Sequence, residues 1–142
     1  MIINRDTKTN IHESAVISDE STIGSGTIIG AGAIIGHGVI LEDNCIIGTG
    51  VIIEEKTVVK SGSVIEPGVI LGTGVTVGEK TKIGMGAKIF HRVTIAPNSV
   101  IKIGEIVLKD MVYKMVFKRG AWIYREDSLN HEKDDDKRGE EK

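Results

Sequence analysis

An aliphatic residue returns every six positions along most of this chain, and this period limits the possible folds more than any other feature. The series begins at Ile11 and runs without an insertion for sixteen hexads, over residues 11–106. A unit of six residues is too short for a helix and a turn, so each hexad must hold a short strand and a tight turn. The sixteen positions are Ile11, Ile17, Ile23, Ile29, Ile35, Leu41, Ile47, Ile53, Val59, Ile65, Leu71, Val77, Ile83, Ile89, Ile95 and Ile101.

Small residues occupy other positions of the hexad. The residue just after the aliphatic position is often glycine, and a second glycine two positions later gives segments such as residues 24–26 and 36–38. Glycine reaches positive φ without a steric penalty, so these segments predict the corners between strands. Two positions before each aliphatic residue stands another small or modest side chain, for example Ala33, Cys45 or Ala87.

Aromatic residues are scarce, with five in 142 residues, and four of these lie between Tyr113 and Tyr124. Ordinary globular cores rely on buried rings, so the repeats predict a slim all-β fold with an aliphatic interior. No apolar run approaches the length of a membrane span, and the N-terminus lacks an apolar signal core, so we expect a cytoplasmic protein. The single cysteine, Cys45, should be packed inside, and it excludes a disulfide framework or a cysteine-rich zinc site.

The repeated pattern resembles that of the hexapeptide-repeat acyltransferase superfamily, nearest to the sugar N-acyltransferases, in which [LIV]-Gly-x-x-x-x units form a left-handed parallel β-helix. The resemblance implies three hexads per triangular coil, hence five to six coils over residues 11–106 and a prism roughly 25 Å long. Residues 1–10 would be a lead-in and residues 107–126 a short C-terminal cap, as strand or helix. Residues 127–142, which are highly charged, should be disordered.

The outward positions of the strands indicate self-association. Side chains alternate along a strand, so the residue before each core position should point outward. Eight consecutive outward positions are apolar, and with 18 residues per coil they fall on all three faces: Ile28, Ile34, Ile40, Ile46, Ile52, Val58, Val64 and Ile70. A monomer with three exposed aliphatic faces would aggregate. The family's closed homotrimer of parallel prisms fits this pattern.

One corner of the prism combines imidazole and carboxylate groups. Residues 18 apart should stack, which places Asp19, His37, Glu55, Thr73 and His91 in one ladder. His37 and Glu55 would then lie about 5 Å apart, one strand spacing. A carboxylate beside an imidazole can orient the ring as a general base. The alternative is an exposed charge ladder on a solvated corner.

A second resemblance concerns His37 itself. Residues 35–44 resemble the Ile-Ala-His-Asn-Val-x-Ile-Gly-Asp-Asn segment of UDP-3-O-acylglucosamine N-acyltransferases, whose histidine is the general base in a cleft between subunits. The resemblance implies that His37 would deprotonate an acceptor amine or hydroxyl attacking a thioester, with Glu55 orienting the ring. Relatives carry a C-terminal Gly-Asn-Pro-Ala-Lys segment that supports coenzyme A, and this chain lacks it.

Charge is segregated along the chain. Residues 1–74 carry 4 basic and 9 acidic side chains, residues 75–125 carry 10 and 3, and the remaining residues carry 4 and 8. In the family the phosphates of coenzyme A lie toward the C-terminal coils, which suits a basic block there. The resemblance therefore implies that acetyl-coenzyme A or another acyl-coenzyme A contacts Lys88, Phe90, Arg92 and Lys102. Alternatively, the segment 90–92 makes a trimer contact, or the basic block is a generic charged surface.

Two functions remain. The first is an acyl-coenzyme A dependent acyltransferase acting on an amino sugar or a nucleotide-linked sugar, and the family resemblance implies that it transfers an acetyl group. The second is a non-catalytic trimeric scaffold or an inactive relative, which the lack of an inserted substrate loop favours. A carbonic anhydrase of the same fold needs two zinc-binding histidines five residues apart, and the histidines at 12, 37, 91 and 131 contain no such pair, so no metal is expected. Nucleic acid is not expected as a partner, because the net charge is −2 and the coils lack stacking rings.

Overall fold

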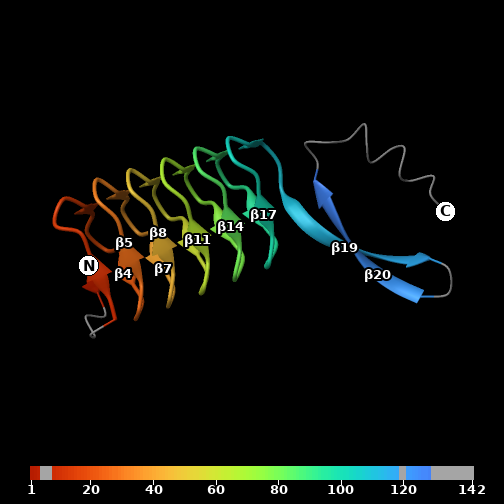
Figure 1. Ribbon diagram of the computed structural model, residues 1–142, viewed down its shortest axis with the longest axis horizontal. Coiled ribbons are helices and arrows are strands. Elements are labelled where there is room, and N and C mark those ends of the chain that lie inside the picture. The colour runs from red at the N-terminus through yellow and green to blue at the C-terminus, as the bar shows by residue number, and fades with distance from the viewer. Residues whose placement is uncertain (4–7, 119–120, 129–142) are drawn as a thin grey trace.

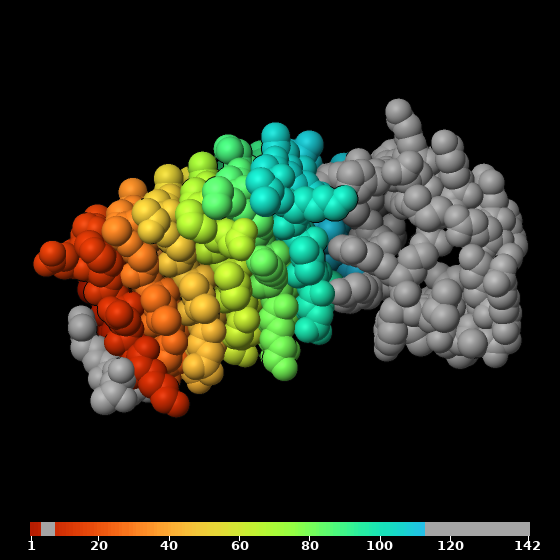
Figure 2. Space-filling view, viewed as in Figure 1, coloured from red at the N-terminus to blue at the C-terminus, as the bar shows by residue number. Residues whose placement is uncertain are grey.

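The computed structural model describes residues 1–3, 8–118 and 121–128, and over these residues the chain forms twenty strands and no helix. Strands β1–β18 have two residues each, and tight turns join β2 to β18 in succession, so that the chain winds into a prism (Figure 1). The space-filling view shows the successive coils packed against one another without a break (Figure 2). Short strands at a fixed spacing are the direct consequence of the six-residue period.

The strands form three sheets, one for each face of the prism. Sheet A holds β1 (Ile2–Ile3), β4 (Thr22–Ile23), β7 (Ile40–Leu41), β10 (Val58–Val59), β13 (Thr76–Val77), β16 (Thr94–Ile95), β19 (Met111–Lys118) and β20 (Ala121–Ser128). Sheet B holds β2 (Asn10–Ile11), β5 (Ile28–Ile29), β8 (Ile46–Ile47), β11 (Val64–Ile65), β14 (Lys82–Ile83) and β17 (Val100–Ile101). Sheet C holds β3 (Val16–Ile17), β6 (Ile34–Ile35), β9 (Ile52–Ile53), β12 (Ile70–Leu71), β15 (Lys88–Ile89) and β18 (Ile106–Val107).

Each strand pairs in parallel with the strand one coil later. Ile35 lies opposite Ile53, and Leu71 lies opposite Ile89, so the spacing between stacked residues is 18. Three hexads therefore complete one coil, and about six coils build a left-handed parallel β-helix. The fold predicted from the repeat is confirmed.

The interior of the prism is a column of aliphatic side chains. Ile35, Leu41 and Ile47 are buried, whereas the residues just before them, Ile34 and Ile40, are exposed. Each fully buried side chain of this size contributes about 1.5–3 kcal/mol to stability. The predicted alternation of inward and outward positions is confirmed, and apolar side chains remain on the outer surface of all three sheets.

The two glycines of a corner serve different purposes. Gly38, the second glycine of residues 36–38, has a φ of 71°, where L side chains are strained. Gly36, the first, is needed because a Cβ there would lie 3.0 Å from the backbone nitrogen of Glu55 in the next coil. The sequence prediction assigned both to positive φ, and the second role, room for the neighbouring coil, was missed.

At both ends of the prism, strands lie outside the sixteen hexads predicted from the sequence. β1 pairs with β4, with Ile3 opposite Ile23, so part of the segment treated as a lead-in belongs to sheet A. At the other end, Met111 of β19 pairs with Ile95 of β16, and β19 then turns into an antiparallel ribbon with β20. The segment predicted as a cap, residues 107–126, thus falls mostly on β19 and β20. The expected disordered tail falls mainly on 129–142, outside the described residues.

Candidate functional site

His37 lies at the corner where the chain passes from β6 in sheet C to β7 in sheet A. The turn is held to the next coil, because the carbonyl of His37 accepts a hydrogen bond of 2.9 Å from the backbone N–H of Lys56. Gly38 completes the turn with its positive φ. The ring is therefore carried by a backbone that is fixed on one side by the coil that follows.

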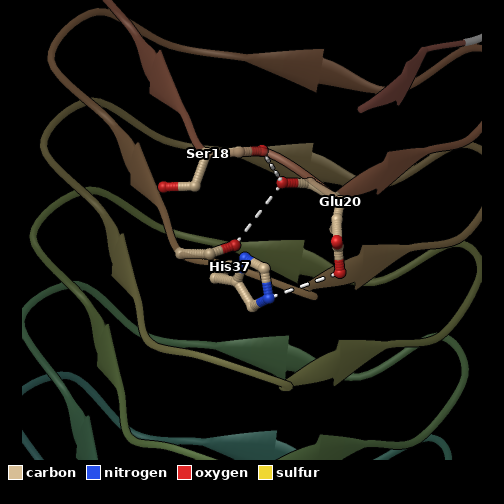
Figure 3. Close-up of polar contacts among 5 residues, drawn as sticks. Ser18, Glu20 and His37 are labelled. Carbon is tan, nitrogen blue, oxygen red and sulfur yellow. Dashed lines mark hydrogen bonds and ion pairs between the residues drawn. The ribbon is translucent and has the colours of Figure 1, made fainter.

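The carboxylate that contacts the ring is that of Glu20. His37 Nε2 lies 3.4 Å from Glu20 Oε1 (Figure 3). The sequence prediction paired His37 with Glu55, whereas the carboxylate found within 4 Å of the ring is that of Glu20. Each corner residue has neighbours in the coils before and after it, and the spacing of 18 does not choose between them. Glu20 reaches His37 from the preceding coil, from a position with a φ of 63°.

A buried hydroxyl ties the two turns of this pair together. The Ser21 hydroxyl, next to Glu20, donates to the carbonyl of Ser18 and lies 3.4 Å from the carbonyl of Gly36. Figure 3 shows these contacts beside the ion pair. Ser21 is fully buried, so its hydroxyl needs these partners. The network connects the turn that carries Glu20 with the turn that carries His37.

The pair has the arrangement of a base and its orienting group. A carboxylate at Nε2 favours the tautomer with the proton on Nε2, which leaves the lone pair of a neutral ring on Nδ1. The side chains of His37 and Glu20 are 49% and 74% exposed, so a ligand can reach them from solvent. On one copy of the chain the pair lies on an open corner.

His91 lies on the same corner three coils later, 54 residues along the chain. Its Nδ1 accepts a hydrogen bond of 2.9 Å from the backbone N–H of Thr73, one coil below. Asp43 makes the equivalent contact at another corner, where its Oδ1 accepts from the N–H of Ser25 at 2.8 Å. His91 therefore caps a turn, and its Nε2 carries the proton when the ring is neutral.

The residues on either side of His91 are exposed. The Phe90 ring is 55% exposed and is tilted by 45° from the His91 ring, with 5.0 Å between the centroids. Arg92 has a φ of 62°, a conformation that favours glycine. This corner thus presents an aromatic ring, an imidazole N–H and a guanidinium group about 14 Å along the prism from His37, at one strand spacing per coil.

The two lysines proposed for the coenzyme are separated. Lys88 is exposed on the outer surface of sheet C, in β15, next to the Phe90 corner. Lys102 follows β17 and lies at the corner between sheets B and C, at the opposite edge of sheet C. The sequence prediction grouped both lysines with Phe90 and Arg92. Within a single chain, only Lys88 lies next to the corner that carries Phe90 and Arg92.

Cys45 is not part of a reactive site. Burial raises the pKa of its thiol to about 11, and Sγ lies 3.3 Å from the carbonyl of Lys60. The expected packed thiol is confirmed. Among the described residues no three His, Cys, Asp or Glu side chains gather as a metal site would require. In the same part of the chain no helix is long and apolar enough to cross a membrane.

Comparisons with known proteins match the repeat and the fold. Residues 20–55, which include both Glu20 and His37, match the family model described as bacterial transferase hexapeptide (six repeats). These residues therefore carry the hexapeptide repeat that this family model describes. The acetyltransferase domain of PglB from Neisseria gonorrhoeae is similar in structure, with a TM-score of 0.71 and 26% identity, over 74% of this chain and 53% of that one. The same domain in complex with acetyl coenzyme A matches with a TM-score of 0.71 and 25% identity, over 75% and 54%.

A third structure adds a nucleotide sugar. PerB from Caulobacter crescentus, in complex with CoA and GDP-perosamine, is similar to this chain with a TM-score of 0.71 and 27% identity, over 82% of this chain and 56% of that one. The chain thus spans just over half the length of these structures. No curated protein sequence matches it. The resemblance to hexapeptide-repeat acyltransferases, seen first in the residues, is confirmed.

Proposed function

We propose that this protein is an acyl-coenzyme A dependent acyltransferase that transfers an acetyl group to an amino sugar or a nucleotide-linked sugar. The observation that carries the proposal is the contact between His37 and Glu20, because it supplies an oriented base on the fold of known acetyltransferases. The PglB domain with acetyl coenzyme A and PerB with CoA and GDP-perosamine support the choice of donor and acceptor. We keep the cytoplasmic location expected from the sequence.

The reaction would be a direct acyl transfer. The acceptor nitrogen attacks the thioester carbonyl while His37 Nδ1 takes the proton that the amine loses. The new C–N bond forms and the C–S bond breaks, and coenzyme A leaves as a thiolate that is then protonated. Glu20 acts as a positioning residue, which holds Nε2–H and stabilises the imidazolium that forms.

The coenzyme would lie along the corner that joins sheets C and A. Arg92 and Lys88 would contact its phosphates, and the Phe90 ring offers a surface for its adenine. The pantetheine arm would then run about three coils, roughly 14 Å, toward His37. Lys102, at the opposite edge of sheet C, would reach the coenzyme only from a neighbouring copy.

A homotrimer would complete the site. The outward residues Ile34, Ile40 and Ile46 belong to three different sheets and are each 40–44% exposed, so more than one face requires cover. Parallel packing of prisms would bring a neighbouring face beside the His37 corner and turn an open corner into a cleft. Light scattering at micromolar concentration should give three times the mass of the chain, and a monomer would overturn this part of the proposal.

The function is tested with acetyl-coenzyme A. Calorimetry should detect binding, and a panel of amino sugars and their nucleotides should then reveal an acceptor by release of the coenzyme thiol. Absence of binding up to millimolar concentration would overturn the transferase and favour a non-catalytic scaffold. The described corners, which are tight turns without an inserted loop, are the feature that keeps the scaffold as the second candidate.

A further inference from the structure

The surroundings of His37 on its corner are acidic. Four carboxylate side chains lie in the turns directly before and after its own, and all four are exposed. They are Asp19 and Glu20 in the coil before, and Glu54 and Glu55 in the coil after. The three turns stack closely, because the carbonyl of His37 accepts from the N–H of Lys56 at 2.9 Å and Glu20 reaches the ring at 3.4 Å. One strand spacing, roughly 5 Å, therefore separates the His37 turn from each of its neighbours.

One cation offsets part of this negative charge. The described turns 18–20, 36–38 and 54–56 contain a single lysine or arginine, Lys56, and a Cβ at Gly38 would lie 3.5 Å from its Cγ. With the His37 ring neutral, four carboxylates and one ammonium leave a net charge of −3 at this level of the corner. Glu54 Oε1 accepts a hydrogen bond of 3.4 Å from the Thr73 hydroxyl, and this uncharged partner holds the carboxylate without neutralising it.

The far end of the same corner has the opposite charge. His91 and Arg92 occupy the turn three coils beyond His37, and Lys88 lies beside them on sheet C. The proposed function puts the phosphates of the coenzyme here, about 14 Å from His37 at one strand spacing per coil. The corner therefore changes sign along the prism. Phosphate groups are favoured at the Arg92 end and repelled at the His37 end, where the acceptor must bind.

We propose that the acceptor at this site is a free amino sugar bound as an ammonium, and not a nucleotide-linked sugar. The inference rests on the proposed acyl transfer and chooses between its two classes of acceptor. An alkyl amine is an ammonium at neutral pH, and one carboxylate about 5 Å away strengthens its binding roughly fourfold in water. The diphosphate of a nucleotide-linked sugar would instead bring negative charge to the same carboxylates. In this respect the chain differs from PerB, whose complex contains GDP-perosamine.

An acceptor that binds as an ammonium loses two protons in the reaction. It gives the first to water before the attack, because only the neutral amine has a lone pair. That lone pair forms the C–N bond as the C–S bond of the thioester breaks, and His37 Nδ1 takes the second proton. The imidazolium then protonates the coenzyme thiolate, so one proton in total is released to solution. Glu54 and Glu55 bind the acceptor without taking part in these steps, so their loss should change KM and not kcat.

The charge of the acceptor is tested with a matched series of probes. Glucosamine, glucosamine 1-phosphate and UDP-glucosamine share one amine and differ in phosphate charge, and other free amino sugars are compared with their UDP-linked forms in the same way. We expect kcat/KM to be at least about tenfold higher for the free sugar. This preference should shrink when the ionic strength rises from about 0.01 M to about 1 M, because the screening length falls from about 30 Å to about 3 Å.

A pair of variants separates the charge of the site from the charge of the whole protein. The double variant Glu54→Gln with Glu55→Gln keeps the shape of both side chains and removes two charges beside His37. It should raise KM for the free amino sugar about fourfold or more and leave kcat nearly unchanged. Glu79→Gln is the matched control, because Glu79 is an exposed carboxylate at the corner between sheets A and B. It should leave KM and kcat at their wild-type values.

The possible results distinguish this inference from the proposed function. If UDP-linked sugars are acetylated as well as the free sugars or better, the acceptor inference fails and the acyltransferase stands. An equal change of KM in Glu79→Gln and in the double variant would also overturn the inference, because overall charge would then explain the effect. If acetyl-coenzyme A binds and no free amino sugar is acetylated, the inference again fails alone. If acetyl-coenzyme A does not bind, both proposals fail.

Discussion

Glu20→Gly separates the role of Glu20 beside His37 from any role in folding. Glu20 has a φ of 63°, and an L residue in this region costs roughly 1–2 kcal/mol, which glycine does not incur. Against this gain, the substitution removes an ion pair whose side chains are 49% and 74% exposed. Exposed pairs contribute at most about 1 kcal/mol. The variant should therefore fold with a Tm equal to or slightly above that of the wild type.

The kcat of Glu20→Gly should fall, although its Tm does not. If Glu20 orients the base, loss of an interaction of about 1 kcal/mol lowers kcat about fivefold, and KM for acetyl-coenzyme A stays unchanged. The assay is release of the coenzyme thiol at saturating donor, run beside a thermal melt. Lys80→Gly is the matched control, because Lys80 also has positive φ, at 53°, and lies at the corner after β13. It should raise or preserve Tm and leave kcat unchanged.

Two results would refute this reasoning. If Glu20→Gly lowers Tm by as much as a core substitution would, Glu20 supports the turn, and the ion pair contributes more to stability than its exposure indicates. If Glu20→Gly and Lys80→Gly have the same kcat as the wild type, the carboxylate beside His37 does not position a base.

Three further substitutions or treatments have defined outcomes. Arg92→Gly should leave Tm unchanged or raise it, because Arg92 also has a positive φ. It should weaken acetyl-coenzyme A binding roughly tenfold in calorimetry, since a charged hydrogen bond is lost. Wild-type affinity in this variant would remove Arg92 from the coenzyme site. His91→Ala should destabilise the fold by roughly 0.5–1.5 kcal/mol in urea titration because the N–H of Thr73 loses its acceptor. His91→Asp should lose less stability, because an aspartate makes the equivalent contact at Asp43. Equal losses in the two variants would contradict the capping role. The Cys45 thiol, with a pKa raised by burial to about 11, should resist a thiol reagent at pH 8 until the chain unfolds. Because the pKa of the Cys45 thiol is higher in the folded than in the unfolded chain, the free energy of unfolding should fall as the pH rises above about 9. Rapid labelling of the native protein at pH 8 would contradict the burial of this thiol.

The regular part of the molecule could be predicted from the sequence because each hexad repeats the same pattern of a strand followed by a tight turn. Ile35 and Ile47 mark inward positions, and Gly36 and Gly48 after them mark corners, so the strands follow from period alone. The number of residues per coil and the left hand came from the resemblance, since a period of six does not specify either. The ends were less predictable, because β1 and the ribbon over 111–128 interrupt the period.

The candidate site was predicted only in part. The corner of His37 follows from the ladder of residues 18 apart, but its partner depends on side-chain rotamers and on a backbone turn at Glu20 that the repeat does not encode. A signal was present, because Glu20 stands where most corners have glycine. Arg92 breaks the same rule at the corner three coils beyond His37. Positive φ at a non-glycine residue therefore adds Glu20, which the ladder does not contain, although Lys80 shows that positive φ alone does not mark a site.

The central claim is that His37 is the base of an acyl transfer, and the most direct test is the rate of coenzyme release by His37→Ala. The measurement compares kcat of the wild type and the variant with the same acceptor at saturating acetyl-coenzyme A. The ring is exposed and makes no core contact, so Tm should be nearly unchanged. We predict a loss of at least about 100-fold in kcat, the contribution of a general base. A variant with wild-type kcat and wild-type Tm would contradict the assignment of His37.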